Sequence, residues 1–432
     1  MIASTLGRGF LRATFSLIIV GLLVTAAAQA RAQVAVKGVL KNYADIAHAG
    51  YEDSLLTAQK LQTAIEAFLA KPNDKTHLAA KNAWIAARVP YQQTEAYRFG
   101  NPVVDDWEGK VNAWPLDEGL IDYVAKSYGT ESDENELYVA NVIASSDIKI
   151  GGQKIDVPKI TKSLLKKVLH EAGEIEANVA TGYHAVEFLL WGQDLNGTDA
   201  GAGKRPPTDY DLKNCTNGNC ARRAEYLRVV TDLLIDDLKW IVAQWAPDGP
   251  ARKELLAGPE AAGLTRIFTG LGSLSYGELA GERMQLGLLI NDPEEEHDCF
   301  SDNTHNSHYY DQLGIQNVYL GRYKRVDGST VSGPSPSDLV KAKSPDVDKA
   351  LRARLEDTLA AMSTMVKRAE TVEAYDQMIG EGNKEGNAVV QAAIDALLGQ
   401  TKAIERAVAT LDLKAIEFEG SDSLDNPEKV KG

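Results

Sequence analysis

The 432-residue sequence lacks the short motifs that mark the common hydrolytic and haem-binding sites. No His-Glu-x-x-His occurs, so the usual helix of a zinc peptidase is not encoded. No Gly-x-Ser-x-Gly occurs, which removes the serine nucleophile of an α/β-hydrolase. The absence of Cys-x-x-Cys-His excludes covalent haem of the c type. A function must therefore be sought in less familiar combinations of residues.

Basic residues are also few relative to acidic ones. The chain has 46 Lys and Arg against 61 Asp and Glu, a formal net charge of −15. Such an excess disfavours binding to nucleic acid or anionic lipid and suits cationic ligands. Solubility alone is the simpler explanation of the same charge.

The sequence contains only three cysteines. Cys215 and Cys220 lie close together in a turn-rich segment and are expected to form a local disulfide. A metal pair is the competing interpretation, but no second Cys or His pair lies nearby to complete a zinc site. Cys299 is then left unpaired, either buried or reactive.

The N-terminus has the pattern of a cleavable secretory signal. Arg8 and Arg12 precede an apolar run over 15–28, which is shorter than a membrane-spanning helix, and Ala30-Arg31-Ala32 fits a cleavage site before Gln33. Residues 1–32 are therefore predicted to be removed, with an uncleaved anchor as the alternative. Their loss removes three arginines and no acid, which leaves 43 basic and 61 acidic residues and a net charge of −18. We expect a periplasmic protein without a transmembrane span in the mature chain.

The remaining sequence has helical periodicity almost throughout, and strand-like alternation is scarce. Apolar residues recur at spacings of three and four, as in Leu227, Val230, Leu234 and Leu238. The pattern predicts an all-α fold of packed helix bundles. The expected helices cover residues 36–70, 75–99, 163–193, 223–245, 276–289, 336–368 and 387–411.

A break in composition divides the mature chain. Residues from Asn196 to Cys220 are rich in Gly, Pro and Asp, as in a connection between bundles. About 400 residues also exceed a single ordinary core. We therefore predict an N-terminal bundle over 33–205, a connecting loop over 206–222 and a C-terminal bundle over 223–432.

One imidazole and one carboxylate interrupt the otherwise apolar run from Gly182 to Asp194. His184 and Glu187 are three residues apart, so on a helix both can reach one point beside the rod. A carboxylate in such an apolar segment needs a cation, a donor or a proton as partner. The pair is a candidate metal site; a satisfied polar pair that fixes the register of the bundle is the alternative.

A second polar stripe lies on the expected helix before it. Trp84, Arg88, Tyr91 and Glu95 follow offsets of four, three and four, which place them on one face. Pro90 within this pattern would kink the helix and direct Tyr91 or Glu95 toward a pocket. Interhelical salt bridges and core packing are the alternative role.

A third cluster, from Glu294 to His308, contains three of the seven histidines and Asp302 among other acids. Imidazole and carboxylate together are ligands of iron, zinc or copper, and His305 with His308 could chelate an ion if the segment is helical. A solvated polar loop is the alternative. Downstream of Trp114, Asp117 and Glu118 could complete an oxygen-rich site or cap a helix.

Several of these motifs resemble the imelysin family, in particular its iron-regulated protein A-like branch. They are Gly182-x-His184-x-x-Glu187, Arg88-x-x-Tyr91-x-x-x-Glu95, and the segments 111–118, 276–283, 294–308 and 314–321. The resemblance extends from about Tyr43 to about Leu411. It implies two helical bundles packed with a cleft between them.

The sequence thus predicts a periplasmic protein of iron acquisition or sensing that binds iron or an iron-bearing ligand in the cleft. His184 and Glu187 are the expected metal ligands, with Arg88, Tyr91, Glu95 and Asp302 lining the site, and iron is favoured over zinc. The family's peptidase label suggests a metallopeptidase as the alternative, with Glu187 as catalytic residue, although Phe188 stands where a second zinc-binding histidine would follow. A helical scaffold that docks an envelope protein is the third alternative.

Overall fold

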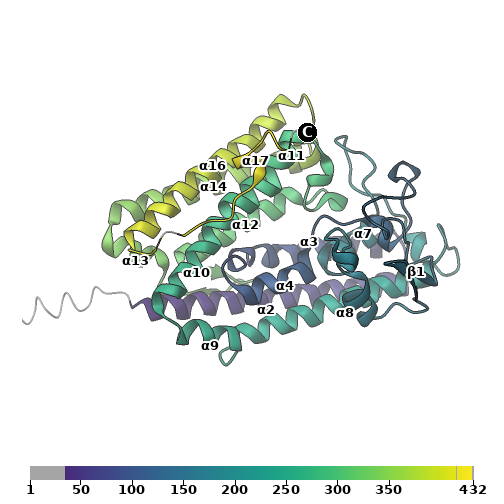
Figure 1. The fold of residues 1–432 in the computed structure, drawn as a ribbon, viewed down its shortest axis with the longest axis horizontal. Coiled ribbons are helices and arrows are strands. Elements are labelled where there is room, and N and C mark those ends of the chain that lie inside the picture. The colour runs from purple at the N-terminus through teal and green to yellow at the C-terminus, as the bar shows by residue number, and fades with distance from the viewer. Residues whose placement is uncertain (1–34, 415, 431–432) are drawn as a thin grey trace, which may run out of the picture.

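The computed structural model describes residues 35–414 and 416–430. The predicted signal peptide, residues 1–32, lies outside the described residues. The regular structure of the described chain is almost entirely helical (Figure 1), with two short antiparallel hairpins, β1–β2 and β3–β4, besides the helices. The predicted all-α fold is confirmed. None of the described helices combines the length and apolar composition that crossing a membrane requires.

The elements follow one another as two runs, which the irregular segment 192–206 separates. The first run is α2 (Val36–Ala70), α3 (Asp74–Gln92), η1 (Glu95–Tyr97), α4 (Pro102–Asn112), α5 (Glu118–Ile121), η2 (Lys126–Tyr128), β1 (Asp147–Ile150), β2 (Gln153–Asp156), α6 (Lys162–Leu164), η3 (Leu165–Leu169), η4 (Ala172–Glu174) and α7 (Gly182–Trp191). The second run is η5 (Pro207–Tyr210), α8 (Cys220–Trp245), α9 (Pro250–Ala257), α10 (Glu260–Ser273), η6 (Leu274–Gln285), α11 (Leu286–Ile290), η7 (Pro293–Glu295), η8 (Cys299–Ser301), α12 (Thr304–Leu320), β3 (Arg322–Lys324), β4 (Thr330–Ser332), α13 (Pro336–Lys343), α14 (Pro345–Thr371), α15 (Tyr375–Ile379), α16 (Lys384–Thr410) and α17 (Asp422–Asp425).

One group of helices packs around α2, which contacts α3 and α8 along its length. The side of α2 that faces these helices is apolar at helical spacing: Leu40, Tyr43, Ala47, Tyr51, Ala58, Leu61 and Phe68 are all buried. Helix α7 packs in the same group, against α3, α4 and α8. Residues 192–219 join α7 to α8, and the predicted disulfide between Cys215 in this segment and Cys220 at the start of α8 is confirmed. The domain division at this segment stays a prediction, and α8, which follows it, lies along α2.

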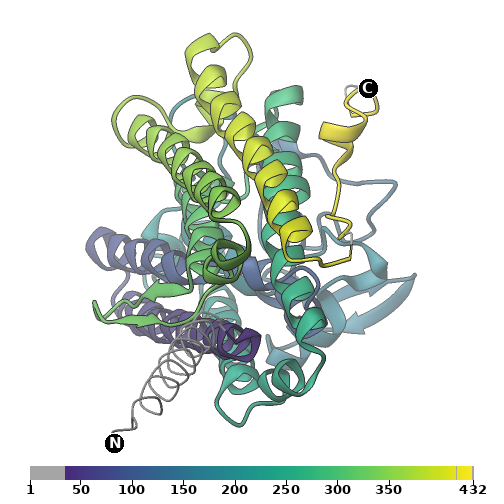
Figure 2. The same ribbon diagram turned by 90° about the vertical axis from the view of Figure 1, so that its left-hand side faces the viewer.

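A second group contains α12, α14, α16 and the helix η6 (Figure 2). Helix α14 packs against α16 and α12, and η6 packs against α16. Helix α12 also contacts α3 and η1 of the first group, so it lies at the junction. Side chains from both groups can therefore meet beside α12 and α3.

The expected continuous helix over 163–193 is wrong. The chain there forms the short helices α6, η3 and η4 and an irregular stretch before α7 begins at Gly182. Glu171, Gly173 and Glu174 have positive φ angles, which break the helical hydrogen-bond ladder. Helix α7 is therefore a short element of ten residues, all of them buried.

Three other predicted helices differ from the structure. The helix over 336–368 is two helices, because Pro345 lacks a backbone donor and Ser344 before it is extended, with φ −148° and ψ 95°. The helix over 75–99 ends at Gln92, two residues after Pro90, and continues as η1. The helix over 276–289 is the later part of a longer rod that begins at Glu260, and its segment η6 is a π-helix.

Candidate metal centre

The position of α7 depends on the glycine that begins it. Gly182 has a φ of +81°, and a Cβ at this position would lie 2.5 Å from the carbonyl oxygen of Val111 at the end of α4. A larger residue is excluded by both the backbone conformation and this close approach. Glycine therefore allows α7 to begin directly against α4, and this sets the place of His184 one half-turn later.

His184 and Glu187 form the hydrogen-bonded pair that their spacing suggests. His184 Nδ1 lies 2.9 Å from Glu187 Oε2, and both side chains are fully buried. The other carboxylate oxygen of Glu187 accepts two hydrogen bonds from Ser301, from its hydroxyl at 2.6 Å and its backbone N–H at 3.1 Å. Glu187 thus joins α7 to η8, 114 positions later in the chain.

Asp298 approaches this pair from the segment before η8. Arg88 Nη2 on α3 donates to its Oδ1 at 2.8 Å, and Asn303 and Ser307 donate to its Oδ2. The second Arg88 Nη donates to Asn112 at 2.5 Å. The guanidinium also lies 5.2 Å from the centre of the Tyr183 ring, within cation–π range. Asp298 is therefore a fully buried carboxylate held in one orientation by charged and neutral donors.

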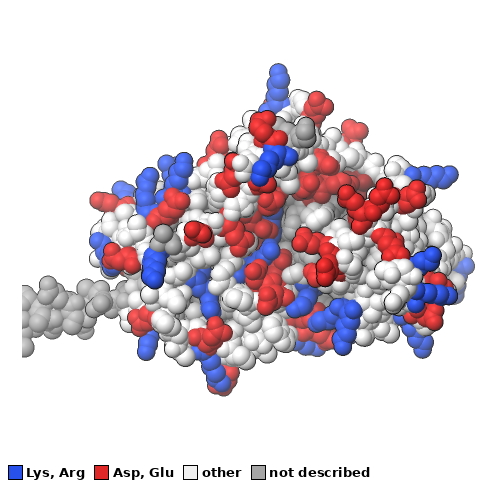
Figure 3. Space-filling view, viewed as in Figure 1, with Lys and Arg blue, Asp and Glu red and all other residues white. Residues whose placement is uncertain are grey.

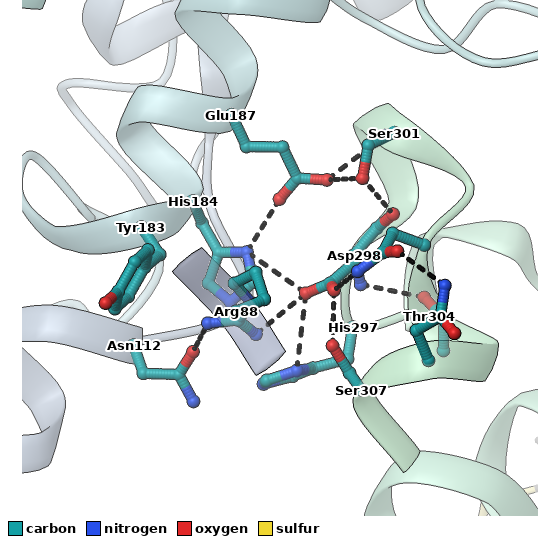
Figure 4. Close-up of polar contacts among 12 residues, drawn as sticks. Arg88, Asn112, Tyr183, His184, Glu187, His297, Asp298, Ser301, Thr304 and Ser307 are labelled. Atoms are coloured by element: carbon teal, nitrogen blue, oxygen red, sulfur yellow. Dashed lines mark hydrogen bonds and ion pairs between the residues drawn. The ribbon is translucent and has the colours of Figure 1, made fainter. Parts of the chain in front are cut away.

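These contacts bring three potential ligands to one point. His184, His297 and Asp298 each offer an atom, and these atoms all lie within 4.8 Å of one another. The Nδ1 atoms of the two histidines are each 3.9 Å from Asp298 Oδ1. Figure 4 shows that His184 comes from one side of the cluster, whereas His297 and Asp298 come from the other.

Both imidazoles are held in the neutral form. Burial lowers the pKa of His184 well below its usual value, and the charge of Arg88 adds to this effect. Burial likewise lowers the pKa of His297 well below its usual value, with Arg283 as the next cause. Neutral imidazole is the form that binds metal ions.

The two carboxyl groups differ. Burial would raise the pKa of Asp298, but Arg88 and the surrounding donors hold it below its usual value. Burial raises the pKa of Glu187 well above its usual value, and the charge of Asp298 contributes in the same direction. Asp298 is thus the anionic group of the cluster.

Two imidazole nitrogens of the cluster have no hydrogen-bond partner although they are buried. They are His184 Nε2 and His297 Nδ1. An unsatisfied buried polar atom costs about 1–3 kcal/mol, so a native protein generally provides a partner for it. Two imidazoles and one carboxylate are a set of ligands that divalent transition metals accept, and such an ion would supply a partner for an imidazole nitrogen.

An open pocket lies next to the cluster, with a volume of about 430 Å³. Its lining includes Asn112, Trp114, His297, Arg98, Glu278 and Arg283. The Trp114 ring lies 5.1 Å from that of His184 and 6.5 Å from that of His297. Figure 3 shows acidic side chains gathered between the two groups of helices on this face. His297 therefore lies between the buried cluster and the outside.

Two residues that the sequence analysis assigned to the site lie beside it in other contacts. Tyr91 is buried, with its ring 4.9 Å from that of Tyr183. Glu95 accepts a hydrogen bond from Arg283 at 2.9 Å. It belongs to a separate ion-pair cluster, in which Arg283 also contacts Glu278 and Asp311.

The remaining candidates in segment 294–308 also lie apart from His184. Asp302 ends η8 with a positive φ of 54°, and the charges that most affect it are those of Asp376 and Asp194. His305 and His308 lie on α12, as their spacing suggested; His308 packs against the Tyr375 ring at 5.2 Å. Neither belongs to the group of three potential ligands.

His297 and Asp298 were part of a recognised polar segment, but the sequence analysis did not single them out. No local signal distinguishes them from their neighbours Glu294, Asp302 and His305. Their role depends on contacts with α3 and α7, more than 100 positions earlier. The available clue was that Arg88 has no acidic residue within four positions of it in the sequence and so needed a partner from another segment.

The comparisons with known proteins show the family and the fold of this chain. The Imelysin family model matches residues 47–404. Iron-regulated protein A of Synechococcus elongatus is 23% identical over 367 residues, which cover 82% of this chain and 80% of that protein. The crystal structure of a proposed iron-regulated protein A precursor from Parabacteroides distasonis has a TM-score of 0.60 and 17% identity, covering 87% of this chain and 95% of that one. The family model spans most of the chain and includes every residue of the candidate centre, and so the protein belongs to the imelysin family.

Proposed function

We propose that this protein binds iron, as the ion or as an iron-bearing ligand, at His184, His297 and Asp298, and that it serves iron acquisition or sensing in the periplasm. The observation that carries the proposal is the meeting of two neutral imidazoles and one carboxylate, with two nitrogens left without partners. The names of the relatives support a relation to iron, since both are called iron-regulated.

The type of ligand supports iron ahead of zinc. Two histidines and one carboxylate with open positions are the ligand set of many non-haem ferrous sites. Zinc also accepts such ligands, so it is the ion against which iron must be compared. No thiolate contributes, because Cys299 is buried and outside the group of ligands.

Glu187 has a different role in this proposal from that of a direct ligand. One of its oxygens is bonded to His184 and the other to Ser301. An ion bound at Nε2 would place the ring proton on Nδ1 and favour ionisation of Glu187, whose carboxylate would then accept that proton and fix the tautomer. Glu187 therefore orients His184. A fully buried carboxylate with both oxygens engaged is also poorly placed to act as the general base of a peptidase.

Two observations support a periplasmic location. The predicted signal sequence is one, and the disulfide between Cys215 and Cys220 is the other, because disulfides persist in oxidising compartments. Fractionation of cells that produce the full-length protein, with residues 33–432 alone as control, tests this part directly. Cytoplasmic retention of the full-length protein would contradict it.

The test of binding is a titration of protein lacking residues 1–32 with ferrous and ferric iron and with zinc, beside the variant His184→Ala. We expect one saturable site that prefers iron and is lost in the variant. His48→Ala, a histidine on α2 that pairs with Glu52, is the matched control and should bind as the wild type does. Absence of saturable iron binding to the wild type would refute the proposal.

The same proteins can test the two alternatives. Proteolysis that is present in the wild type and lost in Glu187→Gln with the fold intact would favour a metallopeptidase. A protein whose role in cells survives His184→Ala would favour a scaffold that docks an envelope partner. We expect neither result.

A further inference from the structure

The pocket in front of His297 is lined by an excess of one charge. Its walls contain six glutamates and two arginines, Arg98 and Arg283. Both arginines are engaged by acidic side chains. Arg283 contacts Glu95, Glu278 and Asp311, and Arg98 contacts Glu108 and Glu278. Neither arginine thus leaves its positive charge free to attract an anion.

The other four glutamates of the pocket are Glu171, Glu176, Glu282 and Glu295. Among the described residues, no lysine or arginine forms an ion pair with any of them. Glu171, Glu176 and Glu282 are exposed to solvent, and Glu295 is half-buried. They come from three separated segments: 171–176, the π-helix η6 and the short helix η7. Their charges converge on one opening although the sequence places them far apart.

A second, independent feature connects this acidic opening to the buried cluster. His297 lines the pocket, is only 6% exposed, and its Nδ1 has no hydrogen-bond partner. The same imidazole lies 3.9 Å from Asp298 and 4.8 Å, between ring centres, from His184. A cation that enters the pocket would therefore meet the His297 imidazole as its first nitrogen ligand.

We infer that the pocket is an entry vestibule for hydrated metal cations and that it rejects iron already held in an anionic chelate. This inference rests on the proposed function and specifies its substrate class. Charge, and not size, makes the selection, because a volume of about 430 Å³ is within the range of small-molecule sites and would admit a small chelate. A cleft lined by one sign of charge raises the local concentration of counter-ions and their association rates by 10-fold to 1000-fold.

The experiment compares two forms of iron in stopped-flow mixing with protein lacking residues 1–32. Ferrous iron under anaerobic conditions is the cationic probe, and ferric citrate is the anionic one. Quenching of tryptophan fluorescence is the signal, since Trp114 packs on both histidine rings. The triple variant Glu171→Gln, Glu176→Gln, Glu282→Gln removes the exposed charges of the vestibule.

The matched control is Glu260→Gln, Glu356→Gln, Glu370→Gln. These three glutamates are also exposed and do not line the pocket. The change in net charge is the same in both triple variants, so a difference between them reports the position of the charges.

We expect ferrous iron to associate about 10-fold more slowly with the vestibule variant, with a weaker dependence on ionic strength and an unchanged dissociation rate. The control variant should match the wild type, and ferric citrate should not transfer intact to the wild type. Equal association rates in both triple variants, or saturable uptake of ferric citrate as a complex, would overturn the vestibule while leaving metal binding intact. Failure of ferrous iron to bind the wild type at all would overturn the proposed function and the vestibule together.

Discussion

Two clusters of buried charge lie where the two groups of helices meet, and they differ in the kind of atom that is left without a partner. In the first, Arg283 donates from Nε, Nη1 and Nη2 to Glu278, Asp311 and Glu95. In the second, Arg88 neutralises Asp298, yet His184 Nε2 and His297 Nδ1 remain without partners. Each guanidinium nitrogen of Arg283 is engaged and the unpartnered atom of its cluster is a carboxylate oxygen, Asp311 Oδ1, whereas the cluster around Asp298 leaves imidazole nitrogens unpartnered.

The comparison suggests how to separate a structural charge cluster from a binding site in one protein. Burial and shifted pKa values occur in both clusters, so neither property is diagnostic alone. The property that separates them is a group of potential metal ligands close together, and this group lies around Asp298. The Arg283 cluster should accordingly control stability, and the Asp298 cluster should control binding.

The largest effect is expected for Arg283→Met. The substitution leaves Glu95, Glu278 and Asp311 without their shared cation, and breaking a buried ion pair in this way costs about 3–5 kcal/mol. Urea unfolding of the metal-free protein measures the loss. Arg283→Lys should recover part of it, because lysine restores the charge without the three-way geometry of the guanidinium. A loss below about 1 kcal/mol would show that the cluster is not structural.

The converse is expected for His297→Ala. It should weaken iron binding by more than about 100-fold, since the loss of a ligand exceeds the 10-fold to 100-fold effect of an outer-shell change. The free energy of unfolding of the metal-free protein should change by only about 1 kcal/mol, the order of effect of many single substitutions. Titration calorimetry and urea unfolding measure the two quantities. Unaltered iron affinity in a folded variant would remove His297 from the site.

A smaller effect on affinity should follow Glu187→Gln, which replaces the carboxylate that orients His184. We expect iron to bind about 10-fold to 100-fold more weakly while the stoichiometry stays at one, because the ligating atoms remain. If iron binding is abolished in a folded variant, Glu187 is a direct ligand, as the sequence analysis predicted.

The smallest effect concerns carboxyl groups outside both clusters. Burial raises the pKa values of Glu118, Glu294 and Asp376 to about 7. In the folded protein these groups keep their protons to higher pH than in the unfolded chain, so the stability they contribute is present at low pH and is lost as the pH rises toward 7. Asp376→Asn should therefore stabilise the protein by about 1 kcal/mol at pH 8 and hardly at all near pH 4. Urea unfolding at both pH values measures it, with the exposed Asp395→Asn as control; an equal effect of the two variants would contradict the assignment.

Much of the fold could be predicted because it depends on local periodicity. Helix α2 has the predicted bounds, and α8 and α16 differ by a few residues at their ends. The helix predictions that were wrong are those in which the backbone conformation of a few residues ends a helix. Pro345 was a visible signal for a break that the periodicity analysis passed over, whereas the positive φ angles at Glu171 and Glu174 belong to residues that ordinarily favour helices.

Only the contacts of the site that lie within one segment of the sequence could be predicted. The spacing of His184 and Glu187 was enough to place them on one face, and the structure pairs them directly. Asp298 and His297 are more than 100 positions away, and only the packing of α12 and η8 against α3 and α7 brings them close. The sequence analysis treated Arg88 and Glu95 as parts of one polar stripe. In the structure Arg88 contacts Asp298 and Glu95 contacts Arg283, so the two residues belong to different clusters.

The most direct test of the account is the crystal structure of the iron-loaded protein, with anomalous differences measured at the iron absorption edge. We predict one strong peak bonded to His184, His297 and Asp298, with Glu187 hydrogen-bonded to His184 and outside the coordination shell. A peak elsewhere, such as at His305 and His308, or the absence of any peak in protein that contains iron by chemical analysis, would contradict the central claim.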